Sequence, residues 1–476
     1  MNKVRTRFAP SPTGYLHIGG LRTALYSYLF AKNQGGDFIL RIEDTDRNRY
    51  VEGAVELIYS TLEEANLIWD EGPDKGGDFG PYVQSERKDI YLEYAKKLVE
   101  LGGAYYCFCT KERLEGLTDE NGQRKYDKKC LSLTKEEVEE KIKNGVPYVI
   151  RQNIPKEGKC SYHDLVFGDV EFDYKDMEDN ILIKSDGMPT YNFANVVDDH
   201  LMGINYVMRG TEYLSSTPKY NLMYDTFGWD RPFYVHMPPI MKNSKEKLSK
   251  RNGDASYADF IEKGYIKDAI VNYIALLGWS PKGDVEKMSF EELKANFSID
   301  GISKHPAIFD EKKMKWLNGE YFKGMTDEEF YNVAKPFIDK TAIAGMFDEK
   351  YVAKLMRTRV EILTEIADKV NPLATYEDFD LNLFVHQKMK CNLEVAKTVL
   401  LKAAEILPNV EWTNESIYAA LTQIVAELEM KNSQVLWAFR IAITGLQSTP
   451  GGASEMAVLI GKEKTLERIA KTLERL

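Results

Sequence analysis

The chain has 476 residues, of which 43% are hydrophobic and 29% are charged, and its formal net charge at pH 7 is −11. This composition is ordinary for globular proteins and excludes collagenous, low-complexity and largely disordered chains. No stretch approaches the ~20 apolar residues that a membrane-spanning helix requires, and the first residues lack the apolar segment of a signal peptide. Five cysteines are too few for a disulfide framework in a chain of this length. We therefore expect a cytoplasmic protein of about three domains with no membrane partner.

The first forty residues are expected to form a β-α-β unit. Residues 4–9 form a short extended run, residues 21–32 carry apolar side chains at helical spacing, and residues 38–42 form a second strand. Such a unit predicts an α/β protein with a parallel sheet and helices packed on it.

The middle of the chain mixes helices and strands. Helices are expected at 88–101, 135–143 and 217–227, and strands at 148–151, 170–174, 181–184, 206–208 and 233–236. The simplest interpretation is a sheet domain interrupted by an inserted α+β domain. After about residue 257 nearly every segment is typical of a helix, including 269–277, 327–338, 352–370, 394–406 and 416–430.

The loop after the first strand has the sequence PSPTGYLHIGG, residues 10–20. A strand-to-helix loop directs backbone N–H groups at an anion, and the helix dipole adds to the attraction. His17 could donate a hydrogen bond to a phosphate, and Gly19 and Gly20 leave room for a base or ribose beside the backbone. Taken alone, the pattern favours the simpler interpretation, a surface histidine and a glycine pair at the start of a helix.

A basic cluster lies at residues 242–251, with five lysines and arginines against one acid, although the chain as a whole is acidic. Lys247 and Lys250 lie three residues apart in the sequence KLSKRNG. Lysines on a mobile loop suit a leaving pyrophosphate, where negative charge develops as a phosphate bond breaks. A charge run alone is usually a solvated face, but the two motifs together are specific. No Walker-type or dinucleotide-type glycine loop is present.

These two motifs resemble the signature motifs of class I aminoacyl-tRNA synthetases. Residues 7–14, 41–47, 189–200 and 215–219 narrow the likeness, because they resemble the glutamyl-tRNA synthetase family of bacterial type. The resemblance is dense to about residue 320 and looser beyond it. It implies a Rossmann-type catalytic domain with an α+β insertion and an all-α C-terminal anticodon-binding region.

The resemblance implies a Rossmann-type domain that comprises residues 1–84 and 190–244 and an acceptor-binding insertion that comprises residues 85–189. A stem-contact domain with the KLSKR loop covers 245–327, and the helical anticodon-binding region covers 328–476.

The resemblance also implies a reaction. L-Glutamate would be attached to the 3′ end of tRNA-Glu through a glutamyl-adenylate, with release of AMP and pyrophosphate, and Mg²⁺ would accompany ATP. His17, Lys247 and Lys250 are the expected catalytic residues. The expected ATP contacts are Pro10, His17, Gly19, Gly20, Lys247, Leu248, Ser249 and Lys250.

Recognition of glutamate requires cations for its side-chain carboxylate and an acceptor for its ammonium group. Arg7 and Arg209 lie at strand ends, where open α/β sheets bind ligands, and the resemblance gives both to that carboxylate. It also implies that Ser11 and Glu43 bind the α-amino group of glutamate and that Tyr191 and Asn195 complete the pocket. The alternative for Arg41, Glu43, Asp44 and Asp46 is a surface ion-pair network. We prefer a functional role for Glu43 and the ion-pair interpretation for Asp44 and Asp46.

Two positions depart from the family pattern. Gly20 stands where many class I enzymes have a second histidine, and Thr211 stands where an acidic residue is usual.

A metal site is a further possibility that the residues leave open. Cys107, Cys109, Tyr126 and Cys130 resemble a zinc site of some relatives, and three thiolates with a phenolate could complete a tetrahedron around one structural Zn²⁺. Cys160 and His163 offer a competing pair. The alternative is a set of reduced, partly buried cysteines.

The candidate anticodon contacts in the helical region are Arg357, Arg359, Arg440 and Thr444. Arg359 falls where family members that accept only tRNA-Glu carry an arginine, which favours a discriminating enzyme. The expected partners are tRNA-Glu, L-glutamate and ATP. The protein is expected to be a monomer. A non-discriminating enzyme that also charges tRNA-Gln and a non-catalytic RNA-binding paralogue are alternatives. A glutaminyl-tRNA synthetase should end in β-barrels, and a glutamyl-queuosine enzyme should stop after the catalytic part.

Overall fold

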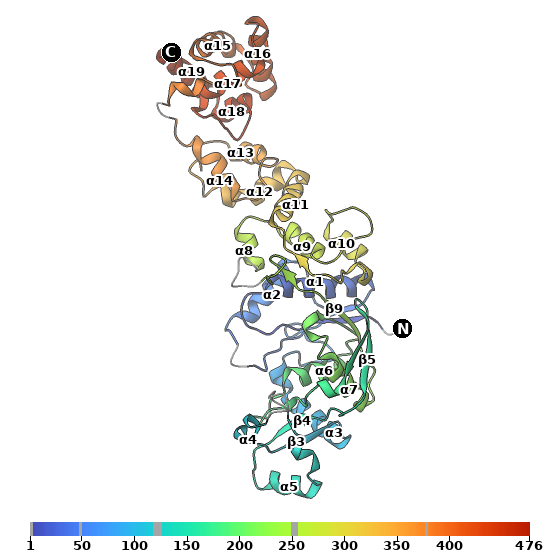
Figure 1. Ribbon diagram of the computed structural model, residues 1–476. Coiled ribbons are helices and arrows are strands. Elements are labelled where there is room, and N and C mark those ends of the chain that lie inside the picture. Colours follow the sequence, from blue (N-terminus) through green and yellow to red (C-terminus); the bar gives the residue numbers. More distant parts are fainter. Residues whose placement is uncertain (1–2, 47–49, 118–125, 249–255, 377–378) are drawn as a thin grey trace. The chain divides into compact units, whose positions relative to one another are not determined.

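The computed structural model describes residues 3–46, 50–117, 126–248, 256–376 and 379–476. The chain divides into two compact units (Figure 1). The first contains residues 1–261 and 267–310, and the second contains residues 262–266 and 311–476. No described helix is both long enough and apolar enough to cross a membrane.

The first unit begins with the predicted β-α-β unit. Strands β1 (Arg5–Phe8) and β2 (Asp37–Leu40) pair in parallel, and the buried helix α1 (Ile18–Asn33) connects them. Gly36 makes the tight turn into β2 possible, because a β-carbon there would collide with the carbonyl oxygen of Val4. The expected parallel start of the sheet is therefore confirmed.

The sheet continues through four more strands in the order β8-β9-β5-β6. These are β8 (Tyr206–Gly210), β9 (Phe233–Met237), β5 (Lys159–Asp164) and β6 (Gly168–Asp173). Strand β8 lies beside β1, because the Arg5 N–H donates to Asn205 Oδ1 at 2.8 Å and the Asn205 N–H donates to the Arg5 carbonyl at 3.1 Å. Strand β5 pairs in parallel with β9 through Asp164 and Tyr234 and was not predicted from the sequence.

A separate antiparallel sheet has the order β3 (Ala104–Cys107), β4 (Val149–Gln152) and β7 (Ile181–Ile183). Helices α3 (Lys88–Glu100), α6 (Tyr191–Leu201) and α7 (Thr217–Phe227) bury a shared apolar core against it. Helix α5 (Lys135–Lys143) lies near this sheet in Figure 1 and begins at a capping box between Thr134 and Glu137.

The rest of the first unit contains short elements. Its remaining helices and strands are α2 (Ala54–Glu64), α4 (Lys111–Glu115), β10 (Ile240–Met241), α8 (Tyr257–Glu262), α9 (Lys267–Leu276), α10 (Phe290–Asn296) and β11 (Ala307–Ile308). Helices α9 and α10 cover α1, where the Tyr26 hydroxyl donates to the Ala275 carbonyl at 2.9 Å and the Tyr26 and Phe297 rings lie 5.0 Å apart. Short 3-10 turns of the chain lie at Gln84–Arg87, Lys129–Ser132, Tyr174–Asp176, Thr211–Tyr213, Ile299–Gly301, Asn371–Leu373, Leu381–Phe384 and Leu407–Asn409.

Helices joined by turns and loops make up the described part of the second unit, in which no β-strand is found. Its helices are α11 (Glu311–Gly324), α12 (Asp327–Ile338), α13 (Glu349–Met356), α14 (Glu365–Val370), α15 (Leu393–Ile406), α16 (Asn414–Glu427), α17 (Asn432–Thr444), α18 (Ala453–Ile460) and α19 (Lys462–Arg475). The prediction of an all-α C-terminal region is confirmed.

The expectation of one helix over 352–370 is wrong, because the helix ends at Met356 and resumes at Glu365. Backbone donors in between bond outside the helix: the Leu363 N–H donates to the Gly264 carbonyl at 3.0 Å, and the Glu361 N–H donates to the Glu365 carboxylate at 2.9 Å. These bonds replace those to the carbonyl four residues back that a continuous helix requires.

Candidate active site

A cavity of about 300 Å³ opens at the carboxyl ends of β1, β8 and β9. This edge is where open α/β sheets bind ligands. Its lining residues come from the strand ends, the start of α1, the start of α6 and the segment after β10. They are Arg7, Phe8, Ala9, His17, Gly19, Gly20, Arg22, Thr23, Tyr191, Met208, Arg209, Gly210, Glu212, Tyr213, Met237, Pro239, Ile240, Lys247 and Leu248.

His17 caps the start of α1 and faces this cavity. Its Nδ1 accepts a hydrogen bond from the Gly19 N–H at 3.0 Å, so the neutral ring carries its proton on Nε2. Gly20 lies close to its neighbours, because a β-carbon there would sit 2.9 Å from Leu16 Cδ1. A histidine at position 20 would therefore have to displace Leu16.

Lys247 reaches the cavity from a tight hairpin that follows β10. The Leu248 N–H donates to the Ile240 carbonyl at 3.0 Å, and the Lys242 N–H donates to the Glu246 carbonyl at 2.8 Å. Leu248 is buried and holds the end of the hairpin, whereas Lys247 is exposed beside the cavity. Two further predicted ATP contacts, Ser249 and Lys250, lie outside the described residues.

Arg7 is a buried cation that already has a carboxylate partner. Its Nε lies 3.1 Å from Asp199 Oδ1, and its Nη1 donates to the Met208 carbonyl at 3.3 Å. Burial lowers the pKa of Arg7 and Arg41 lowers it further, but Asp199 and Tyr191 act in the opposite direction, and the net shift is upward. Burial likewise opposes ionisation of Asp199, but Arg7 and Arg41 lower the pKa of its carboxyl group. The charge of Arg7 is therefore matched within the protein.

Arg209 is held differently, by neutral groups. Its Nε donates to His236 Nε2 at 3.1 Å and its Nη2 donates to Thr217 Oγ1 at 2.6 Å. The rings of Tyr213, Tyr220 and Tyr234 lie 4.8 to 5.3 Å from the guanidinium carbon. Arg209 forms no ion pair with a carboxylate of the described residues, so its charge is available to a ligand in the cavity.

The predicted surface network around Arg41 is instead a buried one. Arg41 is completely buried, and its guanidinium contacts Glu43 at 3.0 Å and Asp199 at 2.8 Å. Burial raises the pKa of Glu43 to about 7 against the opposing effects of Arg41 and Arg7. The surface interpretation is therefore wrong for Arg41 and Glu43. Asp44 accepts a hydrogen bond from the Ser85 N–H at 2.8 Å.

Several predicted residues do not line the main cavity. Glu43 and Ser11 line a smaller one of about 20 Å³ together with Pro12, Thr13, Asp46 and Tyr50. Asn195 is buried within α6 and donates to the Tyr191 carbonyl at 2.6 Å. Pro10 lines neither cavity, although its carbonyl accepts a hydrogen bond from the Glu43 N–H at 3.0 Å.

Other residues of the site were not predicted from the sequence. Asp199 lies in the segment 189–200, and its only local signal is the pair of adjacent carboxylates, Asp198 and Asp199, near the end of a helix. His236 and Arg22 gave no local signal, because their contacts come from segments distant in the sequence. Arg22 donates to the carbonyls of Leu277 and Pro238.

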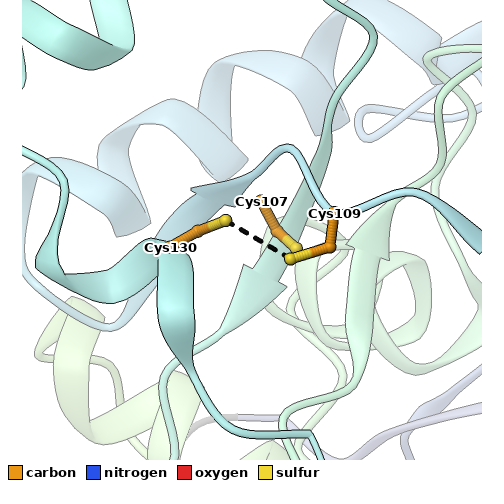
Figure 2. A group of neighbouring side chains, drawn as sticks. All are labelled: Cys107, Cys109 and Cys130. Carbon is orange, nitrogen blue, oxygen red and sulfur yellow. Dashed lines mark hydrogen bonds between the residues drawn. The ribbon is translucent and has the colours of Figure 1, made fainter. Parts of the chain in front are cut away.

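Three cysteines gather beside the β3–β4 sheet (Figure 2). The sulfur atoms of Cys107, Cys109 and Cys130 lie within 4.8 Å of one another. The Tyr126 hydroxyl lies 3.1 Å from Cys107 Sγ and 3.7 Å from Cys109 Sγ. Among the described residues, this is the only group of three or more His, Cys, Asp or Glu side chains that lie close enough together to hold a metal ion. The four residues fit a thiolate-rich zinc site in their chemistry and proximity.

The competing pair, Cys160 and His163, does not form a site. Both lie on β5, but Cys160 faces the interior and His163 faces solvent, since neighbouring side chains of a strand alternate between its faces. His163 Nδ1 lies 2.7 Å from the exposed Asp169 carboxylate. This alternative is therefore wrong.

The four candidate anticodon residues lie in the second unit. Arg357 donates to the carbonyls of Lys323 and Met325, whereas Arg359 contacts the Glu455 carboxylate at 2.8 Å. Both arginines lie in the break between α13 and α14 rather than in the expected helix. Arg440 is partly buried on α17, and burial lowers the pKa of its guanidinium. The Thr444 hydroxyl donates to the Arg440 carbonyl at 2.7 Å.

Comparisons with known proteins cover both units. Residues 3–316 match the family described as tRNA synthetases class I (E and Q), catalytic domain, and residues 329–473 match the anticodon binding domain family. The glutamate–tRNA ligase of Clostridium kluyveri is 54% identical over 484 residues, covering 100% of this chain and 99% of the relative. That of Clostridium tetani is 54% identical over 480 residues, covering 100% and 98%.

Two solved structures are similar over their whole length. A glutamate–tRNA ligase from Elizabethkingia meningosepticum, solved in complex with its amino acid, has a TM-score of 0.90 and 34% identity and covers 100% of both chains. The glutamate–tRNA synthetase of Elizabethkingia anophelis has a TM-score of 0.89 and 34% identity, covering 99% of this chain and 100% of that one.

Proposed function

Because the chain belongs to the glutamate–tRNA ligase family, within the class I aminoacyl-tRNA synthetases, we propose that it attaches L-glutamate to the 3′ end of tRNA-Glu. The observation that carries this proposal is the cavity at the carboxyl edge of the Rossmann-type sheet. One space of about 300 Å³ is lined by Arg209, whose charge is unmatched by a described carboxylate, and by His17 and Lys247, which suit phosphate groups. A carboxylate substrate and a nucleotide can therefore meet there.

The reaction consists of two displacements. The α-carboxylate of glutamate attacks the α-phosphorus of ATP, which forms glutamyl-adenylate and releases pyrophosphate. The terminal ribose hydroxyl of tRNA then attacks the activated carbonyl carbon, and AMP leaves. Neither step requires a protein base, because the glutamate carboxylate is already a nucleophile and a phosphate oxygen of the adenylate can accept the proton of the ribose hydroxyl, which leaves with AMP. Catalysis therefore consists mainly of positioning and charge stabilisation.

The roles of the residues follow from their surroundings. Arg7 and Arg209, which both line the cavity, bind the side-chain carboxylate of glutamate, and Asp199 holds Arg7 in place. Glu43 and Ser11 attract the ammonium group, and Tyr191 closes the pocket beside Tyr213, with the ring centres 5.4 Å apart. His17 donates from Nε2 to ATP phosphates, with Gly19 and Gly20 giving the nucleotide access to the backbone.

Lys247 stabilises the departing pyrophosphate, and Lys250 and Ser249 complete this loop. Mg²⁺ accompanies ATP and binds mainly phosphate oxygens and water, so a cage of protein carboxylates is not required.

We also propose that Cys107, Cys109, Cys130 and Tyr126 hold one structural Zn²⁺. The clustering of the three sulfur atoms supports the proposal, and Tyr126 lies within contact of two of them. A structural zinc would cross-link β3 to the segment that carries Cys130.

The domain boundaries given above remain our proposal, with residues 85–189 as the acceptor-binding insertion, 245–327 as the stem-contact domain and 328–476 as the anticodon-binding region. A glutaminyl enzyme is disfavoured, because the described part of 311–476 contains no β-strand of the expected barrels. We further propose that the protein acts as a cytoplasmic monomer.

Within this family we propose a discriminating enzyme that charges tRNA-Glu only. The test is charging of purified tRNA-Glu and tRNA-Gln with radiolabelled glutamate, ATP and Mg²⁺. Charging of tRNA-Glu alone is the expected result. Charging of both would retain the enzyme and overturn the role of Arg359, and charging of neither would favour a non-catalytic RNA-binding paralogue.

A further inference from the structure

Behind Arg209 lies a buried chain of hydrogen bonds that crosses three neighbouring strands. Asp164 ends β5, His236 lies on β9 and Arg209 lies on β8. Asp164 Oδ2 and His236 Nδ1 are 2.6 Å apart, and Arg209 Nε donates to His236 Nε2 at 3.1 Å. Asp164 and His236 are completely buried. None of the roles proposed above uses either residue.

The donors and acceptors of this chain permit only one arrangement of protons. A guanidinium can only donate, so His236 Nε2 must accept from Arg209. The neutral ring then carries its proton on Nδ1 and donates it to Asp164. The other Asp164 oxygen accepts from the N–H groups of Val166 and Phe167 at 2.9 and 2.8 Å, which fixes the carboxylate.

The surroundings of His236 agree with a neutral ring. Burial lowers the pKa of His236 and Arg209 lowers it further, whereas Asp164 and Glu212 act in the opposite direction; the net shift is downward. Thr217 lies 3.4 Å from Nε2, and the Tyr234 ring stacks 6.0 Å away.

The same bonds leave one face of Arg209 for a ligand. Nε and Nη2 are used by His236 and Thr217, and Nη1 has no hydrogen-bond partner among the described residues. The Thr217 hydroxyl in turn donates to the Tyr213 carbonyl at 2.8 Å, so both anchors are themselves fixed.

We propose that Asp164 and His236 are positioning residues that aim the Arg209 guanidinium at the side-chain carboxylate of the amino-acid substrate. Asp164 selects the His236 tautomer, and His236 accepts from Arg209 Nε so that Nη1 points into the cavity. This inference rests on the proposed role of Arg209 in binding glutamate.

Asp164→Asn tests the tautomer with almost no change in shape. When the asparagine oxygen keeps the N–H groups of Val166 and Phe167, its amide takes the place of Oδ2 and donates to His236 Nδ1. The bond that Oδ2 accepts from the His236 backbone N–H at 3.2 Å is then lost as well. The ring proton then moves to Nε2, where it opposes the Arg209 Nε–H. We expect the KM for glutamate to rise about tenfold, the cost of losing one charge-assisted hydrogen bond. The KM for ATP and the kcat at saturating glutamate should stay unchanged.

Two variants of His236 separate its contact with Arg209 from its contact with Asp164. In His236→Gln the side-chain oxygen can occupy the place of Nε2 and accept from Arg209, whereas the shorter His236→Asn keeps only the contact with Asp164. We expect the glutamate KM of H236Q to stay near the wild-type value and that of H236N to rise as in D164N. A milder effect of H236N than of H236Q would overturn the proposal, because a role that rests on the Asp164 contact alone favours the variant that retains this contact.

The matched control is the exposed pair of His163 and Asp169, whose side chains also lie 2.7 Å apart. Asp169→Asn should leave both KM values unchanged.

Arg209→Lys distinguishes failure of this inference from failure of the proposed function. If R209K raises the glutamate KM but D164N and H236N do not, the positioning role of Asp164 and His236 is wrong and the role of Arg209 stands. If R209K has no effect, the role of Arg209 is itself wrong. In the R209K background D164N should add nothing, since residues that act through one group are not additive, and a full additional effect would overturn the proposal.

Discussion

The guanidinium of Arg7 is fixed to the carboxylate of Asp199, with Nε 3.1 Å from Oδ1 and both side chains almost completely buried. The same oxygen also accepts a hydrogen bond from Arg41 at 2.8 Å. One carboxylate from α6 therefore ties β1 to the segment that follows β2. This bond holds Arg7 at the wall of the cavity, whereas Arg209 in the same wall has no carboxylate partner among the described residues.

Asp199→Asn should destabilise the protein strongly, because it leaves two buried arginines with too little negative charge. We expect the free energy of unfolding to fall by about 3 kcal/mol, as for other broken buried ion pairs. Urea denaturation would measure the change. Asp225→Asn is the matched control, since Asp225 pairs with Arg231 at the surface, and its loss should cost less than about 1 kcal/mol. Equal effects of the two variants would contradict the stabilising role of the buried pair.

The activity should depend on the ionisation of Glu43. Its pKa is raised to about 7, so the carboxyl group gains a proton as the pH falls through that value and loses the charge that attracts an ammonium group. We expect kcat/KM for glutamate to fall below pH 7, because this constant reports ionisations of the free enzyme.

Glu43→Gln should abolish this acidic limb and lower kcat/KM roughly tenfold or more. Asp46→Asn, which alters an exposed carboxylate of the same small cavity, should retain the limb. If the limb persists in E43Q, it belongs to another group.

Lys247→Ala should impair the chemical step rather than substrate binding. If Lys247 stabilises the leaving pyrophosphate, its loss should lower kcat about a hundredfold and leave the KM for glutamate unchanged. Pyrophosphate exchange in the presence of tRNA would measure the step directly. Lys245 lies on the same hairpin but does not line the cavity, so the Lys245→Ala variant should behave as the wild type. Equal losses in both variants would point to general electrostatic attraction.

Metal analysis of the purified protein should find about one equivalent of zinc, because structural zinc sites bind tightly. Cys130→Ser should lose the metal and lower the melting temperature, and a chelator should do the same to the wild type. Cys160→Ser, at a buried cysteine outside the cluster, should retain the metal. Less than roughly a tenth of an equivalent in untreated wild type would contradict a structural zinc site.

Arg359→Gln should admit tRNA-Gln as a substrate if Arg359 excludes it. The pairing of Arg359 with Glu455 keeps the guanidinium in one place, with about a third of its side chain exposed. Arg475→Gln is the control, since Arg475 is not a candidate anticodon contact and donates to the backbone carbonyl of Phe379 at 2.7 Å. For each variant, the rates of charging of tRNA-Glu and of tRNA-Gln would be measured, and their ratio compared with that of the wild type. An unchanged ratio in R359Q would mean that other residues exclude tRNA-Gln.

Local sequence signals predicted much of the fold. The bounds of the helices at 135–143, 217–227 and 327–338 agree with the structure to the residue. Two of these helices begin at capping boxes, which are written entirely in neighbouring residues. Strand β5 was missed because its buried side chains include Asp164 as well as Cys160 and Tyr162. A charged residue on the buried face hides the apolar alternation that identifies a strand.

The site was predicted where it depends on motifs and missed where it depends on tertiary contacts. His17, Lys247, Arg7 and Arg209 meet at one cavity because their motifs lie at strand and helix ends. The partners that hold the two arginines, Asp199 and His236, are known only once distant segments have folded together. The break between α13 and α14 has a similar cause, since Gly264 supplies the carbonyl that captures the Leu363 N–H.

The pairing of β5 with β9 limits how freely this protein can be recombined with its relatives. Strand β5 belongs to the segment 85–189, yet it pairs with a strand of the catalytic sheet and carries the carboxylate that holds His236. A chimera that exchanges the whole segment also exchanges one strand of the active-site sheet. The part that can be exchanged is therefore smaller than the segment. Residues 159–173 must stay with the catalytic part, and only the three-stranded sheet with helices α3, α4 and α5 is interchangeable.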